Sequence, residues 1–390
     1  MRGSLKLFTW FGIPVHLHWT FGLIFLYALW VGHANELDWI GTIWLMGFFI
    51  ALFTCVLLHE YGHSLTARRY GVETRDIILT PIGGIARLEK MPEKPMQEFL
   101  VAIAGPMVNV VIAALLFGLS MLIFDGERWE LFKWFLRDQL LLSGGEDAGD
   151  VMEESGIALS GILFYLPVLV ATNIALVVFN LIPAFPMDGG RIFRSLLAMR
   201  IGRVRATKMA ALLGQVIAVV FIVTGVLNWQ SASTLTLIGF FVFITARTEN
   251  SMVQLDDILR RYKARDLLRR HYTRLHDNDW MKTPVELIRH GLERNFLVFD
   301  LTDRLMGTLG EEEIVAAIKK GDYSAEIGQY MQKVELVSIE ESLQYVYYLL
   351  QQRGVPIIGV MDGGELAGVI DDAGFQHFMR LENATTGKRR

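Results

Sequence analysis

Cysteine is nearly absent from this chain, and charged residues are scarce. The single cysteine among 390 residues, Cys55, excludes an internal disulfide and says little about the redox compartment. Charged residues make up 20% of the chain, whereas roughly 25% is usual for a soluble protein, and apolar residues make up 52%. The formal net charge of −4 argues against a general nucleic-acid-binding protein. The location of the apolar residues therefore decides the class of protein.

The apolar residues are concentrated in long blocks within the first 247 residues. A helix needs about 20 largely apolar residues to cross the hydrocarbon core of a bilayer. Six stretches have this character: 12–32, 39–66, 97–124, 157–181, 206–228 and 232–247. The first contains two histidines and is followed by no small-residue cleavage site, so we interpret it as a retained span rather than a signal peptide.

Lysine and arginine residues near the ends of these stretches predict their orientation. With six spans, the four basic segments all lie on one side: the N-terminus, 67–96, 182–205 and the segment after 247. The opposite side is poor in basic residues, and its longest segment, 125–156, is either an interfacial helix or a loosely ordered loop. Both termini are therefore predicted to be cytoplasmic.

A metal-binding pattern stands at the predicted cytoplasmic end of the second stretch. Residues His59-Glu60-Tyr61-Gly62-His63 place two histidines four positions apart, on one face of a helix, where both imidazoles can reach one zinc ion. The glutamate beside the first histidine is placed to take a proton from water activated by the metal. The alternative is a pair of polar residues at a membrane boundary, but ionisable residues within a span are costly.

Catalytic zinc usually has three protein ligands, so a third is expected. Asp188 lies in the stretch NLIPAFPMDGGR, which closes the fourth apolar block on the same predicted side as His59. Two prolines prevent a continuous helix there, and Gly189-Gly190 permits a sharp turn. A lone aspartate after a span is otherwise a helix-end residue, but the predicted topology places this one near the zinc.

Three further residues are candidates with a simpler explanation. Cys55 lies one turn before His59, but cysteine in a span is more often a small apolar packing residue. His16 and His18 either approach the active site or mark the interface beside Trp19, and we favour the interface.

These motifs resemble those of the site-2 protease family of intramembrane metalloproteases. The matching segments are HEYGHSLTARRYG, LTPIGGIARLE (79–89), GPMVN (105–109) and NLIPAFPMDGG (180–190), in the family's order within about residues 10–250. The resemblance implies that His59, His63 and Asp188 bind one catalytic zinc ion (Zn2+) and that Glu60 is the general base. It also implies that Asn180 helps to hold substrate or the developing oxyanion; capping of broken backbone is the alternative.

The resemblance further implies that residues 72–89 form a membrane-associated β-hairpin near the metal. The pattern VETRDIIL, TPIG, GIARLE is itself that of strand, turn and strand. An exposed edge of such a hairpin can pair with an unwound substrate segment by strand addition.

After residue 250 the pattern changes to amphipathic helices and short apolar strands. We expect a connecting helix at 251–270, then two similar helix–strand–turn–strand–helix units within 271–382, and a disordered tail at 383–390. The repeat resembles a tandem cystathionine-beta-synthase (CBS) pair, a module that often binds adenine nucleotides and regulates an attached protein.

The usual CBS ligand signature, Gly-x-x-Ser/Thr-x-x-Asp, departs from its pattern in both units. It appears as GTLGEEE (307–313) and GVIDDAG (368–374), without the hydroxyl residue. The extra carboxylates would repel phosphate. Homodimerisation or the docking of a partner is therefore an equal alternative to binding of an adenine nucleotide.

Together these observations predict a polytopic α-helical membrane protein with about six transmembrane helices and a short β-hairpin in residues 1–250, followed by a C-terminal α/β cytoplasmic CBS-pair-like domain. The predicted function is zinc-dependent cleavage of a single-span membrane protein near the cytoplasmic end of its transmembrane segment. The absence of a targeting segment favours a prokaryotic inner membrane. No nucleic-acid partner is expected.

Two other classes of function remain as alternatives. One is an inactive zinc-binding relative that serves as a membrane chaperone or scaffold, and Glu60 beside intact ligands argues against it. The other is a transporter, which the lack of an evident duplicated span pattern disfavours.

Overall fold

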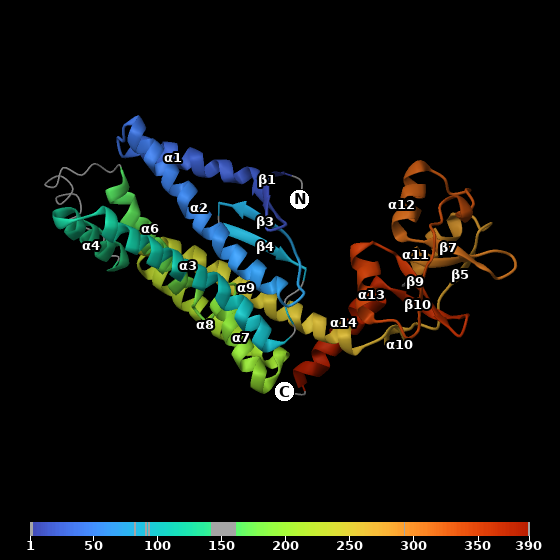
Figure 1. Ribbon diagram of the computed structural model, residues 1–390. Helices are drawn as coiled ribbons and strands as arrows, with labels where there is room; N and C mark the ends of the chain where they lie inside the picture. Colours follow the sequence, from blue (N-terminus) through green and yellow to red (C-terminus); the bar gives the residue numbers. More distant parts are fainter. Residues whose placement is uncertain are drawn as a thin grey trace. The chain divides into compact units, whose positions relative to one another are not determined.

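The structure, a computed structural model, describes residues 3–81, 83–89, 92, 94–141, 161–291 and 293–388. The chain divides into an N-terminal unit, residues 1–251, and a C-terminal unit, residues 252–390 (Figure 1). Each unit has its own hydrophobic clusters.

The N-terminal unit is built mainly from helices. Three of the described helices are long and apolar enough to cross a membrane: α2 (Trp39–Arg68), α3 (Pro95–Ile123) and α8 (Arg203–Leu227). Two shorter helices, α1 (Gly22–Ala34) and α6 (Ile162–Asn180), are also apolar. The other α-helices among the described residues here are α4 (Gly126–Leu141), α7 (Asp188–Ile201) and α9 (Trp229–Arg261), the last of which continues into the C-terminal unit.

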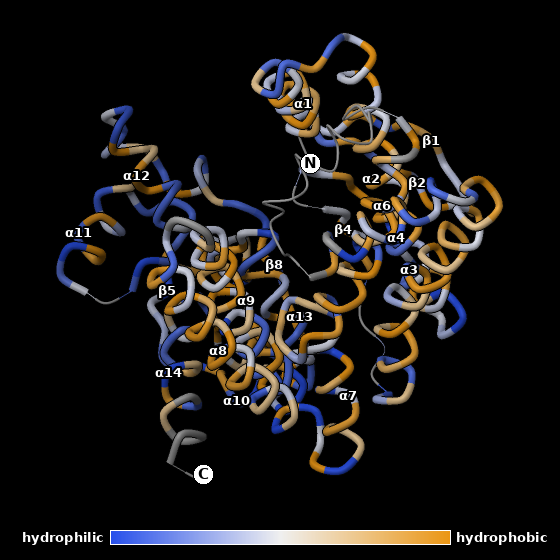
Figure 2. The backbone as a smooth tube through the Cα atoms, turned by 90° about the vertical axis from the view of Figure 1, so that its left-hand side faces the viewer, coloured by the Kyte–Doolittle hydropathy of each residue, from blue (hydrophilic) through white to orange (hydrophobic). Residues whose placement is uncertain are grey.

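The apolar helices turn much of their hydrophobic surface outward. Only 22%, 33% and 28% of the most apolar window is buried in α2, α3 and α8, respectively. In Figure 2 the tube of these helices is orange, the colour of hydrophobic residues, over most of their length. An exposed apolar surface of this extent is incompatible with water but suits the hydrocarbon of a bilayer, where helices satisfy their own backbone hydrogen bonds.

The helices differ from the predicted spans in two places. The first predicted span, 12–32, begins as a strand, and helical structure starts only at Trp19. The sixth, 232–247, is part of α9, which continues to Arg261 and has non-helical backbone at Ala232. Residues 142–160 of the fourth predicted span and of the preceding segment lie outside the described residues. Three spans are thus supported by length and composition, and the count of six stays a prediction.

A four-stranded sheet packs against α2. Its order is β1 (Ser4–Trp10), β2 (Ile13–His18), β3 (Thr74–Thr80) and β4 (Gly83–Leu88). The pairs β1–β2 and β3–β4 are antiparallel, whereas β2–β3 is parallel. The predicted hairpin at 72–89 is present as β3–β4, but the N-terminal hairpin was not predicted.

Buried side chains fix this sheet beside the metal-binding pattern. Ile13, Val15 and Ile77 form one cluster with Phe53 and Leu57 of α2. Because Leu57 precedes His59 by two residues, the cluster holds the sheet at the level of the histidines.

The C-terminal unit contains two three-stranded sheets of identical topology. The first is β5 (Arg274–His276), β6 (Phe296–Phe299) and β7 (Leu305–Leu309); the second is β8 (Glu335–Ser338), β9 (Ile357–Asp362) and β10 (Glu365–Asp371). In each, the middle strand is parallel to the first and antiparallel to the last. The predicted repeat lacked the short first strand of each unit.

Helices follow the same repeated order in this unit. They are α11 (Lys282–His290) and α12 (Glu311–Lys320) in the first half, and α13 (Leu343–Tyr347) and α14 (Asp372–Lys388) in the second. A buried cluster of Leu297, Phe299, Ile357 and Val369 joins the two sheets.

The ends of the C-terminal unit differ from the prediction. Instead of one connecting helix over 251–270, α9 ends at Arg261, and a short α10 (Ala264–Leu267) follows. The chain then pairs Arg269 with Val369 through two backbone hydrogen bonds, of 2.9 and 3.0 Å. The tail predicted to be disordered from 383 is helical to Lys388 as the end of α14.

Candidate metal centre

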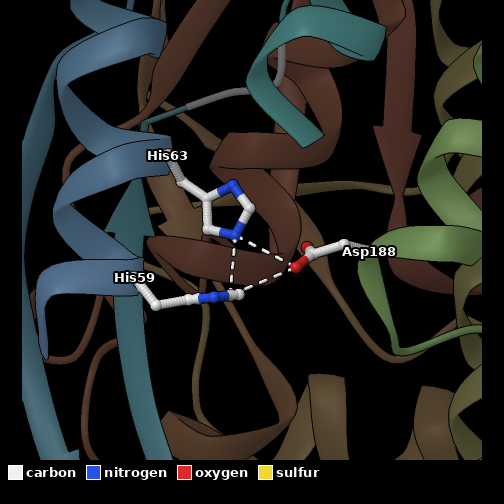
Figure 3. Close-up of side chains that lie close together, drawn as sticks. All are labelled: His59, His63 and Asp188. Carbon is white, nitrogen blue, oxygen red and sulfur yellow. Dashed lines mark hydrogen bonds and ion pairs between the residues drawn. The ribbon is translucent and has the colours of Figure 1, made fainter. Parts of the chain in front are cut away.

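Two histidines and an aspartate that are distant in the sequence meet in the N-terminal unit (Figure 3). The Nε2 atom of His63 lies 3.0 Å from Nε2 of His59 and 3.1 Å from Oδ2 of Asp188. The Nε2 atom of His59 lies 3.2 Å from the same carboxylate oxygen. All three side chains are buried, so their polar atoms face one another rather than solvent.

The local sequence explains how Asp188 reaches the histidines. Asp188 is the first residue of α7, and the two glycines after it lie against the preceding loop. A Cβ atom on Gly189 would lie 2.3 Å from the carbonyl oxygens of Leu181 and Ile182, and one on Gly190 would lie 2.6 Å from Ala184 C. Only glycine fits this approach, so the Asp-Gly-Gly sequence is required to fold the loop back and deliver the carboxylate.

Helix α3 orients the two imidazoles through contacts to their Nδ1 atoms. Nδ1 of His63 lies 2.7 Å from the carbonyl oxygen of Val101, and Nδ1 of His59 lies 2.5 Å from Oδ1 of Asn109. A carbonyl oxygen only accepts, so Nδ1 of His63 donates, and its Nε2 is left with a free lone pair. A Cβ atom on Gly105 would lie 2.2 Å from His63 Nε2, so the glycine leaves the space that the rings occupy.

These three side chains fit a zinc ion in their donor chemistry. Two imidazole nitrogens and one carboxylate oxygen form a common ligand set of catalytic zinc, which keeps a further position for water or substrate. A carboxyl group binds a metal in its ionised form and an imidazole binds it in its neutral form, so this set would carry one negative charge toward the ion.

Glu60 lies on α2, the helix that carries His59 and His63, and its side chain is held by the sheet. Its Oε2 accepts a hydrogen bond of 3.2 Å from the backbone N–H of Ala86 in β4. A Cβ atom on Gly84 would lie 2.8 Å from Cγ of Glu60, which shows how closely β4 passes the side chain. The glutamate is half-buried beside the three clustered residues.

The structure does not place the other sequence candidates in this cluster. Asn180 ends α6, half-buried, and within the described part of the chain its side chain makes no hydrogen bond. Cys55 is buried, with Sγ 3.5 Å from Nδ2 of Asn173. His18 Nδ1 lies 2.7 Å from the hydroxyl oxygen of Thr20.

His16 belongs to a separate ionic group on the sheet. Its Nδ1 lies 3.4 Å from Oδ2 of Asp76, and Arg87 donates two hydrogen bonds to that same carboxylate. The hydrogen bonds from Arg87 hold the pKa of Asp76 below its ordinary value. The Asp76–Arg87 pair links β3 and β4 with the ring of His16 beside it, and none of these residues is part of the His-His-Asp group.

Sequence reasoning missed a buried ionic network near the site. Arg194 of α7 donates from Nε to Glu98 of α3 at 2.7 Å, and its Nη1 donates to Glu249 of α9 at 2.6 Å. Both Arg194 and Glu98 are 1% exposed. From the sequence, Arg194 counted only as one of the basic residues that orient the spans; its partners lie 96 and 55 positions away.

In the C-terminal unit, two carboxylates of the altered signature accept hydrogen bonds from neighbouring groups. Glu313 accepts from the backbone N–H of Gly310 at 3.2 Å and from Gln332 at 2.7 Å. Asp371 accepts from Arg269 at 3.1 Å. These contacts do not test the binding of an adenine nucleotide, which stays a prediction.

A buried His-His-Asp group beside long apolar helices is typical of a metal site in a membrane protein. Comparison with known proteins gives the family. The model of peptidase family M50 matches residues 47–224. The zinc metalloprotease MJ0392 of Methanocaldococcus jannaschii is 30% identical over 377 residues, which cover 95% of this chain and 94% of that protein. The chain belongs to peptidase family M50, the site-2 protease family.

Two solved structures were also similar. The site-2 protease of Methanocaldococcus jannaschii shares 33% identity, with a TM-score of 0.42, over 63% of this chain and 95% of its own. The CBS domains of a transcriptional regulator from Streptococcus pneumoniae share 19% identity, with a TM-score of 0.26, over 30% of this chain and 98% of their own. The predicted resemblance to the site-2 protease family is confirmed. The CBS-like character of the C-terminal unit stays a prediction.

Family membership also confirms the broad prediction of a membrane zinc metalloprotease. It implies zinc as the metal, in agreement with the ligand set of His59, His63 and Asp188. The substrate, the orientation in the membrane and the role of the C-terminal unit are not tested by these comparisons.

Proposed function

We propose that this chain is an intramembrane zinc endopeptidase. It would hydrolyse a peptide bond within or near the cytoplasmic end of a transmembrane segment of a single-span membrane protein. The observation that carries this proposal is the buried group of His59, His63 and Asp188 with Glu60 beside it, three of them on α2, a helix apolar enough to cross a membrane.

The proposed roles follow from the chemistry of each side chain. His59, His63 and Asp188 would hold the metal. Zinc held there would supply Lewis acidity, which would lower the pKa of water towards neutrality and polarise the scissile carbonyl. Glu60 accepts the proton of the attacking water and passes it to the leaving amine. Burial keeps bulk water away, so these groups act at a low effective dielectric constant.

The free edge of β4 is the proposed site for the substrate backbone. Along an antiparallel pair, alternate residues turn their N–H and C=O groups away from the partner strand. Because the N–H of Ala86 reaches Glu60, the backbone groups of Gly84 and Leu88 face the same open edge. An unwound substrate segment can pair there by strand addition. Asn180 is proposed to hold substrate or the oxyanion, with capping of the end of α6 as the alternative.

We further propose six membrane crossings with both termini in the cytoplasm of a prokaryote. In this arrangement residues 1–250 form the protease, and 251–270 connect it to the CBS-like domain of residues 271–382, beyond which α14 continues to Lys388. The CBS-like domain is proposed to modulate cleavage through homodimerisation, partner docking or an adenine nucleotide.

An inactive zinc-binding scaffold is the second candidate, and a transporter is the third. The hydrogen bond from Ala86 to Glu60 favours an enzyme, because it holds a carboxylate beside the three clustered residues, where a base is required. A scaffold has no need of that carboxylate.

The test is co-expression with a tagged single-span reporter, comparing the wild-type chain with Glu60→Gln at equal zinc occupancy. A cytoplasmic fragment formed only by the wild type supports both the activity and the base. A fragment formed by both proteins would point to another protease or another base. If neither forms a fragment while Glu60→Gln captures the reporter, the reporter binds but the wild type is silent, which supports the scaffold.

A further inference from the structure

A line of buried amide groups connects α6 to the metal-facing ring of His59. Nδ2 of Asn173 donates to the backbone carbonyl of Leu169 at 2.9 Å. Nδ2 of Asn109 donates to Oδ1 of Asn173 at 2.8 Å, and Oδ1 of Asn109 lies 2.5 Å from Nδ1 of His59. Both asparagines are 0% exposed, so the bonds are made within the protein.

The backbone end of this line determines its direction. The carbonyl oxygen of Leu169 accepts and cannot donate, so it must face the amino group of Asn173 rather than its oxygen. The second hydrogen of that amino group points to Sγ of Cys55 at 3.5 Å. With both hydrogens used, Asn173 presents its oxygen to Asn109, which must then supply its own amino group.

The consequence reaches the metal-facing nitrogen. Asn109 has turned its amino group to Asn173, and its oxygen is therefore the atom that faces His59. An oxygen there requires the proton of the imidazole to sit on Nδ1. Nε2 of His59 is then unprotonated, with its lone pair facing Asp188 and His63.

We propose that Asn173 is a positioning residue that acts through Asn109 to fix the tautomer and ring orientation of His59. The inference rests on the proposed zinc site. His63 obtains the same tautomer directly from a backbone carbonyl, that of Val101. The tautomer of His59 depends instead on the side chains of Asn109 and Asn173. Substitution of these side chains can therefore weaken metal binding by His59 while all three ligands remain.

The experiment measures zinc affinity of the purified full-length chain by competition with a chelator. Asn173→Leu removes the acceptor that orients Asn109, so the amide of Asn109 is free to turn its amino group toward His59. Substitution of groups that support metal ligands typically weakens metal binding about 10–100-fold, and we expect a loss in that range. Thr172→Val is the matched control, because Thr172 donates only to Val168 O in its own helix, at 2.7 Å; its zinc affinity should stay within about threefold of wild type.

A double-substitution cycle separates positioning from general damage. If Asn173 acts through Asn109, Asn173→Leu added to Asn109→Leu should weaken zinc binding no further than Asn109→Leu alone. Independent, multiplicative losses would overturn the proposal, and so would wild-type affinity in Asn173→Leu.

A second variant keeps the test decisive if Asn173→Leu does not fold. Asn173→Asp keeps an acceptor oxygen for Asn109, and its protonated form also keeps a donor for the carbonyl of Leu169. At a pH where that form is populated, it should retain zinc affinity within about threefold of wild type. A loss as large as that expected for leucine would overturn the inference. Failure of the wild-type chain to bind one zinc ion would instead refute the zinc site and the proposed function.

Discussion

Replacement of Gly105 by alanine should abolish zinc binding although no ligand is changed. Gly105 lies on α3, where that helix passes the two imidazoles. A Cβ atom added there would lie 2.2 Å from Nε2 and 2.5 Å from Cε1 of His63, and 2.7 Å from Nε2 of His59. All three distances are below 3.0 Å, and real Cβ atoms essentially never come so close to another heavy atom.

The size of the effect follows from these distances. Ordinary contact begins at 3.4 Å, so the nearest imidazole nitrogen must retreat by more than 1 Å, or the helices must separate by as much. Metal–ligand distances tolerate deviations of only about 0.2 Å. The ligand geometry is therefore lost, whereas the cost in stability is that of one excess methyl group in a packed interface, about 1–3 kcal/mol.

The assay is the zinc content of purified protein together with its thermal unfolding. Gly62→Ala is the matched control, because its Cβ atom would strain the same α2–α3 interface against Ala104 O and Val108 Cγ2, at 2.8 and 2.9 Å, rather than against the two imidazole rings. Gly118→Ala, with nothing within 4 Å, should change neither property. Full zinc content in Gly105→Ala would refute the reasoning, as would equal zinc loss in Gly62→Ala.

Three further predictions concern the ligand set, the ionic network and the C-terminal unit. Asp188→Ala should lower the zinc content, and unchanged stoichiometry by metal analysis would place the third ligand elsewhere. Arg194→Met should reduce stability by about 3–5 kcal/mol, because it leaves Glu98 buried without its partner; adding Glu98→Gln should restore part of the loss, and an unchanged melting temperature in Arg194→Met would contradict this account. Deletion of 262–390, after the end of α9, should leave a foldable protease with an altered cleavage rate; identical rates on every substrate tested would exclude regulation by this unit.

The sequence predicts the part of the site that depends on local spacing. His59 and His63 are four residues apart on one helix, so the helical repeat alone places their rings together. Asp188 is predicted from its motif and from the side of the membrane on which its segment ends. The structure brings its carboxylate to 3.1 Å from His63.

Contacts between distant segments account for what the sequence did not predict. The register of β2 against β3 depends on packing with α2, and no local pattern encodes it. In the sequence, Asn173 is a polar residue within an apolar stretch, and nothing nearby indicates a role. Its contact with Asn109, which lies on another helix, appears only in the structure. In the same way, the ionic partners of Arg194 come from two other helices.

The parallel pairing of β2 with β3 constrains how the chain is threaded through the bilayer. The two strands share a register from Val15–Ile77 to Leu17–Leu79, yet α1 and α2 lie between them in the sequence. Two paired strands must lie at the same depth in the membrane. The chain between β2 and β3 therefore crosses the bilayer an even number of times, on whichever side of the membrane the two strands lie. The N-terminal hairpin is also synthesised well before its partner. It must therefore wait, unpaired on one edge, until both helices have been placed and β3 has returned to meet it.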